Sequence, residues 1–295
     1  MTRLLIVDGH AYAYRAFHAI RNLRGPEGRP TNAIYGFIKM LEKLRGELAP
    51  AYMIVVWDGG LSAERMAAHP DYKAQRPEMP ADLGPQLDEI LAYLAAVGVA
   101  SYCGERIEAD DYIACLARRA AAAGWQAVIA SPDKDFMQLV SPQVGLWNPN
   151  DKAAGVIWSR EHVLAKAGVE PEQVVDWLAL MGDAVDNIPG VPGVGPKTAA
   201  DLLKRFGSVA VMLTRLDEVK SEKLRAALRE SAEAVRRNLR LVQLHEVACE
   251  FEPERLAIRP ADQEQLRGLF RRWGFKGMLE SLDRTLLSGQ QAELI

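Results

Sequence analysis

The sequence predicts an α/β protein with a mostly parallel central sheet flanked by helices, followed by a helical region. Up to about residue 160, short apolar, β-branched runs alternate with segments of helical periodicity. Such runs are typical of strands buried on both faces, and their alternation with helices favours a parallel sheet. Beyond that point the strand-like runs nearly stop. We therefore expect an α/β core over residues 1–160 and a helical region over residues 161–295.

The individual elements follow from the same patterns in chain order. The expected strands are 4–7, 53–57, 99–103, 127–130 and 144–147. Segments with the i, i+3, i+4, i+7 spacing of amphipathic helices are 34–48, 82–97, 113–123, 174–181, 197–206, 220–228, 232–244 and 263–273. A polar stretch with four prolines over residues 59–85 is longer than an ordinary connection, so we expect it to be a functional insertion.

The composition narrows the class of protein. The chain has 295 residues, of which 49% are hydrophobic and 25% charged, which excludes disorder and coiled coil. Three cysteines without a CxxC spacing indicate a reducing compartment, and no apolar run is long enough for a membrane span. We therefore expect a cytoplasmic protein that is a monomer, and one associated with the nucleoid if it binds nucleic acid. A net charge of −3 gives no global sign of nucleic-acid binding, so the positions of the charges must decide.

Acidic residues gather at the ends of the expected elements. Asp8 and Asp58 end two strands, and others follow a third strand or lie at helix ends. Because ligands bind beyond the carboxyl ends of strands in an open parallel sheet, these acids should converge. Each alone could be a turn residue or helix cap, but nine caps are a poor explanation. The nine are Asp8, Asp58, Glu108, Asp110, Asp111, Asp133, Asp135, Asp183 and Asp186.

Converging carboxylates indicate a bound cation, because they cannot all stay ionised together without one. All-oxygen ligands favour Mg²⁺ or Mn²⁺, whereas zinc would require histidine and cysteine spacings that the five histidines do not show. Two such ions about 3.5–4 Å apart are suited to the in-line attack of water on a phosphodiester. The expected chemistry is phosphoryl transfer to water.

A glycine-rich turn lies between two expected helices, in the sequence GVPGVGPKT over residues 190–198. Glycines let backbone N–H groups approach an anion, and the following helix N-terminus adds a favourable dipole. We interpret residues 174–206 as a helix-hairpin-helix that grips a phosphate backbone through Gly193, Gly195, Lys197 and Thr198. A tight helical turn is the alternative. A dinucleotide fingerprint lacks its preceding strand, and a Walker A motif would need lysine where Pro196 stands.

Basic residues are placed where they could contact nucleic acid. Residues 204–240 carry ten basic side chains against five acids, which predicts either a solvated helix face or a track for duplex DNA. In the insertion, Lys73 and Arg76 could stabilise a scissile phosphate, and Tyr72 could stack on an unpaired base. Arg15, just past Asp8, is a weaker candidate.

In order along the chain, these motifs resemble those of the 5′-nuclease family, which includes the 5′-to-3′ exonuclease domain of bacterial DNA polymerase I and, more distantly, the flap endonucleases. The resemblance covers nearly the whole chain. It is carried by LLIVDGHAYAYRAFHA, VVWD, YKAQRPEMP, EADD, SPDKDFMQLV and GDAVDNIPGVPGVGPKTA.

The resemblance implies a resolvase-like (PIN-like) core with a helical arch over residues 59–85, and a two-metal nuclease that removes 5′ flaps and RNA primers. Asp8, Asp58, Glu108 and Asp110 would hold the first metal; the other five acids would form the second site or its surroundings. Asp110 and Asp135 would be catalytic, with Lys73 and Arg76 as the arch cations. The cofactor would be Mg²⁺, with Mn²⁺ able to substitute, and K⁺ at the hairpin is a further candidate.

The implied partners are DNA with 5′ flaps, nicks or RNA primers, together with a separate DNA polymerase and a ligase. A polymerase I would continue beyond residue 276, so the chain is either a free-standing nuclease or an excised domain. Two positions depart from the family pattern: Glu64 replaces a common aromatic residue, and Pro132 replaces a small one. Two rival functions are a non-catalytic junction-binding module and a haloacid-type phosphatase, although the latter requires aspartate where His10 stands.

Overall fold

The computed structural model describes residues 2–151 and 155–292 of the chain. These residues form two compact units, each assembled from three separate stretches. One unit draws on Met1–Ile6, Asp58–Glu78 and Cys103–Phe251, and the other on Val7–Trp57, Met79–Tyr102 and Glu252–Ile295. Because the first unit runs past position 160 and the second also draws on both sides of it, the division into 1–160 and 161–295 remains a prediction from the sequence pattern.

The strands form a six-stranded sheet in the order β3-β2-β1-β4-β5-β6 and a separate pair, β7-β8. Strand β4 pairs parallel with β5, with Ala127 opposite Val144, and β6 closes the edge antiparallel to β5. A mostly parallel sheet is therefore confirmed. The strands are β1 (Arg3–Asp8), β2 (Tyr52–Trp57), β3 (Ala100–Cys103), β4 (Gln126–Ala130), β5 (Val144–Trp147), β6 (Ile157–Trp158), β7 (Gly182–Asp183) and β8 (Ile188–Pro189).

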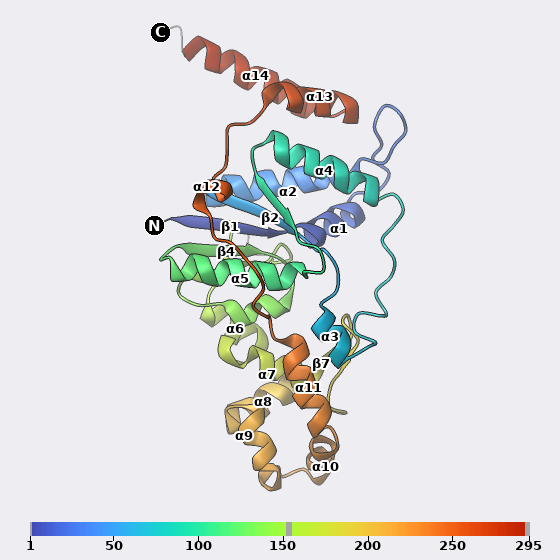
Figure 1. Cartoon of the computed structure of the whole chain (residues 1–295), viewed down its shortest axis with the longest axis vertical. Helices are drawn as coiled ribbons and strands as arrows, with labels where there is room; N and C mark the ends of the chain where they lie inside the picture. The colour runs from blue at the N-terminus through green and yellow to red at the C-terminus, as the bar shows by residue number, and fades with distance from the viewer. Residues whose placement is uncertain (1, 152–154, 293–295) are drawn as a thin grey trace. The chain divides into compact units, whose positions relative to one another are not determined.

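The first unit contains most of the smaller helices. Figure 1 shows α5 lying along β4, and α7 packing against α8 and α11. The α-helices of this unit are α3 (Ala63–Ala68), α5 (Ala109–Ala122), α6 (Arg160–Ala167), α7 (Val174–Met181), α8 (Pro196–Phe206), α9 (Val209–Thr214), α10 (Glu222–Glu230) and α11 (Ala232–Val242). Three 3₁₀ turns complete it: η1 (Lys134–Leu139), η2 (Pro171–Gln173) and η3 (Leu216–Glu218).

The second unit has its own core, built where α1 packs on α2 and where α4 packs on α2 and α13. Its helices are α1 (Gly9–Ala19), α2 (Asn32–Leu48), α4 (Gly84–Ala96), α12 (Pro253–Leu256), α13 (Gln263–Trp273) and α14 (Lys276–Ala292). Phe37 and Leu41 on α2 and Leu94 on α4 are fully buried. Their spacing is the amphipathic pattern that predicts these two helices.

The local sequence explains the central elements. Leu4 to Val7 are fully buried, which fits a strand covered on both faces. Strand β1 ends where the Asp8 side chain accepts a hydrogen bond from Ala11 N–H and starts α1. In the stretch expected to be an arch, one short helix, α3, begins at Ser62, whose hydroxyl accepts from Arg65 N–H. No helix in the described residues is long and apolar enough to cross a membrane.

Candidate active site

The start of α5 brings three of the predicted acids together. Glu108 is the N-cap residue, and Asp110 and Asp111 lie in the first helical turn. The loop that leads to this helix is tied to the residue after Asp58, because Gly59 N–H donates to the Ile107 carbonyl at 3.0 Å and Arg106 N–H donates to the Gly59 carbonyl at 2.9 Å. A Cβ at Gly59 would lie 1.7 Å from the carbonyl oxygen of Gly104, so only glycine permits this approach.

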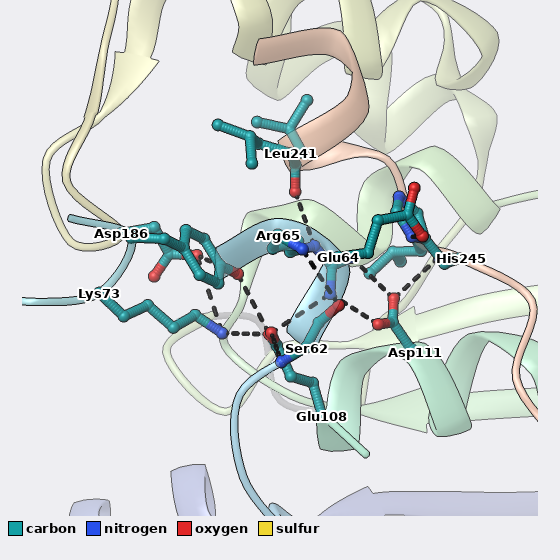
Figure 2. Close-up of polar contacts among 12 residues, drawn as sticks. Ser62, Glu64, Arg65, Lys73, Glu108, Asp111, Asp186, Leu241 and His245 are labelled. Carbon is teal, nitrogen blue, oxygen red and sulfur yellow. Dashed lines mark hydrogen bonds and ion pairs between the residues drawn. The ribbon is translucent and has the colours of Figure 1, made fainter. Parts of the chain in front are cut away.

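Glu108 is buried and is surrounded by donors from the insertion (Figure 2). Its Oε2 accepts from Lys73 Nζ at 2.5 Å and from the Tyr72 hydroxyl at 3.1 Å, and its Oε1 accepts from Ser62 N–H at 2.9 Å. Burial alone would raise the pKa of Glu108, but the positive charges of Lys73 and Arg65 and these hydrogen bonds outweigh it and lower the pKa. Glu108 is therefore held as a carboxylate.

The turn that carries Lys73 docks on the turn between β7 and β8. Lys73 has a left-handed backbone, with φ of 57°, and its N–H donates to the Asp186 carbonyl at 3.0 Å. His69 Nε2 donates to the Asn187 carbonyl at 2.9 Å, and the Asn187 side chain donates to the Asp71 carbonyl at 2.8 Å. A non-glycine residue adopts this backbone only when its surroundings hold it, so the Lys73 ammonium is firmly placed.

Asp186 receives the other cation of this turn. Arg76 Nη2 donates to Asp186 Oδ1 at 2.7 Å, the Tyr72 hydroxyl donates to Oδ2 at 3.3 Å, and Lys73 Nζ lies 4.0 Å from Oδ2. Burial opposes the charge of Lys73, but the carboxylates of Asp110, Glu108 and Asp186 outweigh it and raise the pKa of Lys73. Both predicted arch cations thus lie among the predicted acids.

Tyr72 is oriented differently from the expectation. Only 3% of the residue is exposed, and its hydroxyl bonds two carboxylates. The ring offers no open face for a base in this arrangement, so stacking on an unpaired base receives no support here. Burial and the charges of Asp186 and Glu108 raise the pKa of Tyr72, which keeps it a neutral donor.

A second group of acids follows β4. Asp133 is the N-cap of η1 and accepts from Asp135 N–H at 2.9 Å. Burial, together with the negative charges of Asp133, Asp183 and Asp110, raises the pKa of Asp135 well above its usual value. Burial and the charges of Asp186 and Asp183 likewise raise the pKa of Asp133. Carboxylates from α5, η1 and the β7–β8 turn are therefore close enough to repel one another.

Asp183 completes this cluster. Its Oδ1 accepts from Val185 N–H at 2.9 Å, and its Oδ2 accepts from Lys134 Nζ at 2.8 Å. Burial opposes the charge of Lys134, and the hydrogen bond and charge of Asp183 raise its pKa. In the part of the chain that the structure describes, no three histidine, cysteine, aspartate or glutamate side chains form a group that could hold a metal ion. The predicted acids of this unit thus lie near one another, and Lys73, Arg76 and Lys134 form ion pairs with three of them.

For three predicted residues, the structure gives the element on or beside which each lies but not its position relative to the other predicted acids. Asp58 belongs to the first unit and directly follows strand β2 in the sequence, as expected. Asp8 belongs to the second unit, where it ends β1 and caps α1, and Arg15 lies on α1. Their membership in one site with the other acids remains a prediction from the sequence.

The glycine-rich turn lies at the start of α8. Gly193 has φ of 81°, Gly195 is the N-cap of the helix, and Pro196 occupies its first turn. A Cβ at Gly193 or Gly195 would meet no atom within 4 Å, and Lys197 is exposed. Backbone N–H groups and one ammonium are therefore accessible at a helix start, as an anion site requires.

The basic stretch after α8 is partly neutralised by its own acids. Arg229 pairs with Asp217, and Arg236 pairs with Glu233. Arg215 and Arg205 both contact Glu218. These exposed pairs weaken the case for a continuous duplex track, whereas a DNA contact at Lys197 stays a prediction.

Two residues of the site carried no assigned role in the sequence analysis. Lys134 lies between Asp133 and Asp135 in SPDKDF. This position between two acids is the sequence feature that could have indicated a role for Lys134 in the site. Arg65 is 3% exposed and makes a bidentate ion pair with Asp111, with donor-to-acceptor distances of 2.6 and 2.8 Å. Both oxygens of Asp111 are thus engaged by one guanidinium, a pairing that no local pattern reveals.

The raised pKa of Asp135 predicts how the stability of the folded chain depends on pH. This raised pKa means that the folded chain binds this proton more tightly than the unfolded chain does, so parental stability should fall as pH rises from about 4 through the folded pKa. In EDTA at pH 7.5, Asp135→Asn should raise the melting temperature by about 2–4 °C, the shift for roughly 1 kcal/mol. Thermal melts between pH 4 and 8 test this. Equal melting temperatures for parent and variant at every pH would contradict it.

Mutually repelling carboxylates flanked by cations, together with an exposed glycine-rich turn at a helix start, agree with a hydrolase that acts on nucleic acid. Residues 3–168 match the model of a 5′-3′ exonuclease N-terminal resolvase-like domain, and residues 169–264 match that of a 5′-3′ exonuclease C-terminal SAM fold. The chain therefore belongs to the 5′-3′ exonuclease family. The expected family, fold class and enzyme class are confirmed.

The relatives agree with this assignment. The chain is 38% identical to a 5′-3′ exonuclease of Aquifex aeolicus, over the full length of both. It is also 38% identical to DNA polymerase I of Bacillus caldotenax, where 95% of this chain matches 32% of the relative. A bacteriophage T5 flap endonuclease, solved as a pseudo-enzyme-product complex with DNA and metal ions, shares the fold at 23% identity and a TM-score of 0.67, covering 97% of this chain and 98% of that one.

Proposed function

We propose that this exonuclease is a Mg²⁺-dependent enzyme that hydrolyses phosphodiesters at 5′ flaps, nicks and RNA primers on duplex DNA. The observation that carries the proposal is the gathering of carboxylates from α5, η1 and the β7–β8 turn beside Lys73 and Arg76. Such a site combines the negative charge that recruits cations with positive charge suited to a phosphate.

In the described residues no three acidic side chains of this cluster form a ready metal-binding group, yet their donor chemistry suits a hard divalent cation. All of its acids offer oxygen, their charges repel one another, and the buried Oδ1 of Asp135 has no hydrogen-bond partner. A bound divalent cation would supply activation of a water and charge stabilisation at the leaving oxygen. The residues of the first unit that would hold such ions are Asp58, Glu108, Asp110, Asp133, Asp135, Asp183 and Asp186. Of the nine acids predicted from the sequence, Asp8 belongs to the second unit and Asp111 is bound by Arg65. Mn²⁺ offers similar coordination and should substitute.

Lys73 and Arg76 would act on the substrate through their charge. Each lies on the same short turn, and each is already held beside the carboxylates by a specific ion pair. A scissile phosphate that approached the cluster would meet these two cations without any need to reorganise the turn. Pre-placed positive charge is most effective where negative charge develops during the reaction.

The hairpin at Gly193 to Thr198 would hold the duplex by its phosphates. Exposed backbone N–H groups at the start of α8 and the Lys197 ammonium provide contacts that read no sequence. K⁺ is a candidate cation at the same turn. Sequence-independent binding of this kind suits an enzyme that recognises the shape of a junction.

Lys197→Ala should weaken duplex binding and flatten its dependence on salt. One phosphate contact contributes about one unit to the slope of log K against log salt concentration. Binding titrations of a nicked duplex between about 50 and 200 mM KCl measure that slope. Lys39→Ala, which changes an exposed lysine on α2, is the matched control. A slope equal to the parental one would remove the hairpin from the contacts.

The polymerase I relatives indicate the setting of the reaction. The matched region is about a third of such a polymerase, so we propose that this nuclease works alongside a DNA polymerase and a ligase in replication and repair. We expect it to act as a monomer.

Substrate choice is tested with a 5′-labelled flap duplex, a nicked duplex, an RNA-primed duplex and a single strand of the same sequence. The proposal predicts release of the flap close to its junction and much slower cutting of the single strand. Tight binding of the flap duplex without cleavage would instead identify a junction-binding module whose acids are structural.

A further inference from the structure

The guanidinium of Arg65 is buried, and each of its three nitrogens donates a hydrogen bond. Its Nε donates to the Leu241 carbonyl at 2.9 Å, and Nη2 donates to Asp111 Oδ1 at 2.8 Å and to the Gln243 carbonyl at 2.8 Å. Nη1 donates to Asp111 Oδ2 at 2.6 Å and lies 3.4 Å from Glu108 Oε2. Four hydrogen bonds and one further ion pair thus engage the guanidinium, and Figure 2 shows its contacts with Leu241, Asp111 and Glu108.

These contacts join three segments of the first unit. Arg65 lies on α3, at the start of the stretch that leads to Lys73 and Arg76. Asp111 and Glu108 belong to the start of α5, and residues 241–243 end α11. A single side chain therefore links the base of the insertion to the carboxylates of α5 and to the end of α11.

Both carboxylate oxygens of Asp111 accept hydrogen bonds in this arrangement. Besides the two bonds from Arg65, its Oδ1 accepts from His245 N–H at 2.8 Å, and only 2% of the residue is exposed. Its neighbour Asp110 belongs instead to the mutually repelling cluster, because its charge raises the pKa of Asp135. Asp111 is therefore held by Arg65 and His245, whereas Asp110 lies close enough to Asp135 for its charge to affect that carboxyl.

We propose that Arg65 is a positioning residue for phosphodiester hydrolysis, and that Asp111 is its counter-ion and not a ligand of a catalytic cation. The proposal rests on the nuclease function argued above. Arg65 fixes the register between α3 and the start of α5, and so sets the distance between the cations of the 69–76 turn and the acids Glu108 and Asp110. Lysine could not replace it, because an ammonium has three donors and no planar fork.

The test compares Arg65→Lys, Asp111→Asn and the double variant Arg65→Met/Asp111→Leu. Removing one partner strands a buried charge, whereas replacing both by apolar groups of similar size is often well tolerated. The double variant Arg267→Met/Asp283→Leu is the control, since that arginine–aspartate pair links α13 to α14 in the second unit. Melting temperature, Mn²⁺ affinity of the protein alone, flap-duplex affinity and single-turnover cleavage rate are measured for each.

The double variant at Arg65 and Asp111 should bind Mn²⁺ and the flap duplex within about threefold of the parent, yet cleave about 30-fold more slowly under single-turnover conditions. Arg65→Lys should show the same split, with a smaller loss of rate. Asp111→Asn should also keep its Mn²⁺ affinity. The control pair should cleave at the parental rate.

Three results would overturn the proposal. A folded double variant that cleaves at the parental rate would show that Arg65 positions nothing that matters for the reaction. A tenfold loss of Mn²⁺ affinity in Asp111→Asn would make Asp111 a ligand. Failure of both Arg65 variants to fold even at 10 °C would make the pair a requirement of the fold itself. Failure of the parent to cleave would instead reject the nuclease function, so the two failures are distinguishable.

Discussion

Asp135→Ala should reduce the rate of flap cleavage about 1,000-fold while duplex binding stays within about threefold of the parent. Asp135 lies at the centre of the repelling acids, since burial and the charges of Asp133, Asp183 and Asp110 together raise its pKa. A side chain so placed is costly to the fold, and strongly perturbed carboxyls of this kind are common at functional sites. Removing it should abolish transition-state stabilisation of several kcal/mol.

Duplex binding should survive because the hairpin at the start of α8 supplies separate contacts. Single-turnover rates and binding titrations on the same flap substrate separate the two effects. Asp88→Ala, an exposed acid on α4, is the control for loss of a negative charge. Parental cleavage by Asp135→Ala would show that this cluster is not the reaction centre.

Lys73→Met should reduce the cleavage rate about 100-fold, with a smaller change in duplex affinity. The Lys73 ammonium is buried, lies 2.5 Å from Glu108 Oε2 and senses the charges of Asp110 and Asp186. Under the proposed function this cation lies where the phosphate would react, and removing one such group typically costs a factor of about 100 to 1,000 in rate. Methionine keeps the unbranched apolar stem and removes only the charge and its donors.

The effect must come from the reaction and not from misfolding. Loss of Lys73 leaves Glu108 with its contacts to Arg65, Tyr72 and Ser62, so the carboxylate stays partnered. Lys39→Met on α2 serves as the control for loss of a lysine charge. If Lys73→Met keeps its melting temperature and also the parental rate, Lys73 is only a structural counter-ion of Glu108.

The sequence was most informative where structure depends on near neighbours. The buried runs at Leu4 to Val7 and Ala127 to Ala130 form strands because their period and β-branching are local properties. Asp58 comes directly after β2, and Asp133 comes three residues after the end of β4, so both lie at strand ends as the pattern predicts. The turn before α8 was readable for the same reason, since its glycines and proline act on adjacent residues.

The pairing of charges could not be read from the sequence. Arg65 binds Asp111 and the carbonyls of residues 241 and 243, and Lys134 binds Asp183, across long stretches of chain. The sequence suggests Tyr72 as an aromatic residue on which a base could stack. Its burial results from the docking of its turn against Asp186 and Asn187, which the sequence does not reveal. Such contacts arise from tertiary packing, which composition and periodicity do not predict.

The central claim is that the carboxylate cluster performs divalent-cation-dependent hydrolysis at 5′ junctions. The most direct measurement follows the 5′-labelled product of a flap duplex in Mg²⁺, in Mn²⁺, in EDTA and in EDTA followed by excess Mg²⁺. The account predicts flap release near the junction with either ion, none in EDTA, and recovery when Mg²⁺ is restored. Flap release that continues at an unchanged rate in EDTA, or that no divalent ion supports, would contradict it.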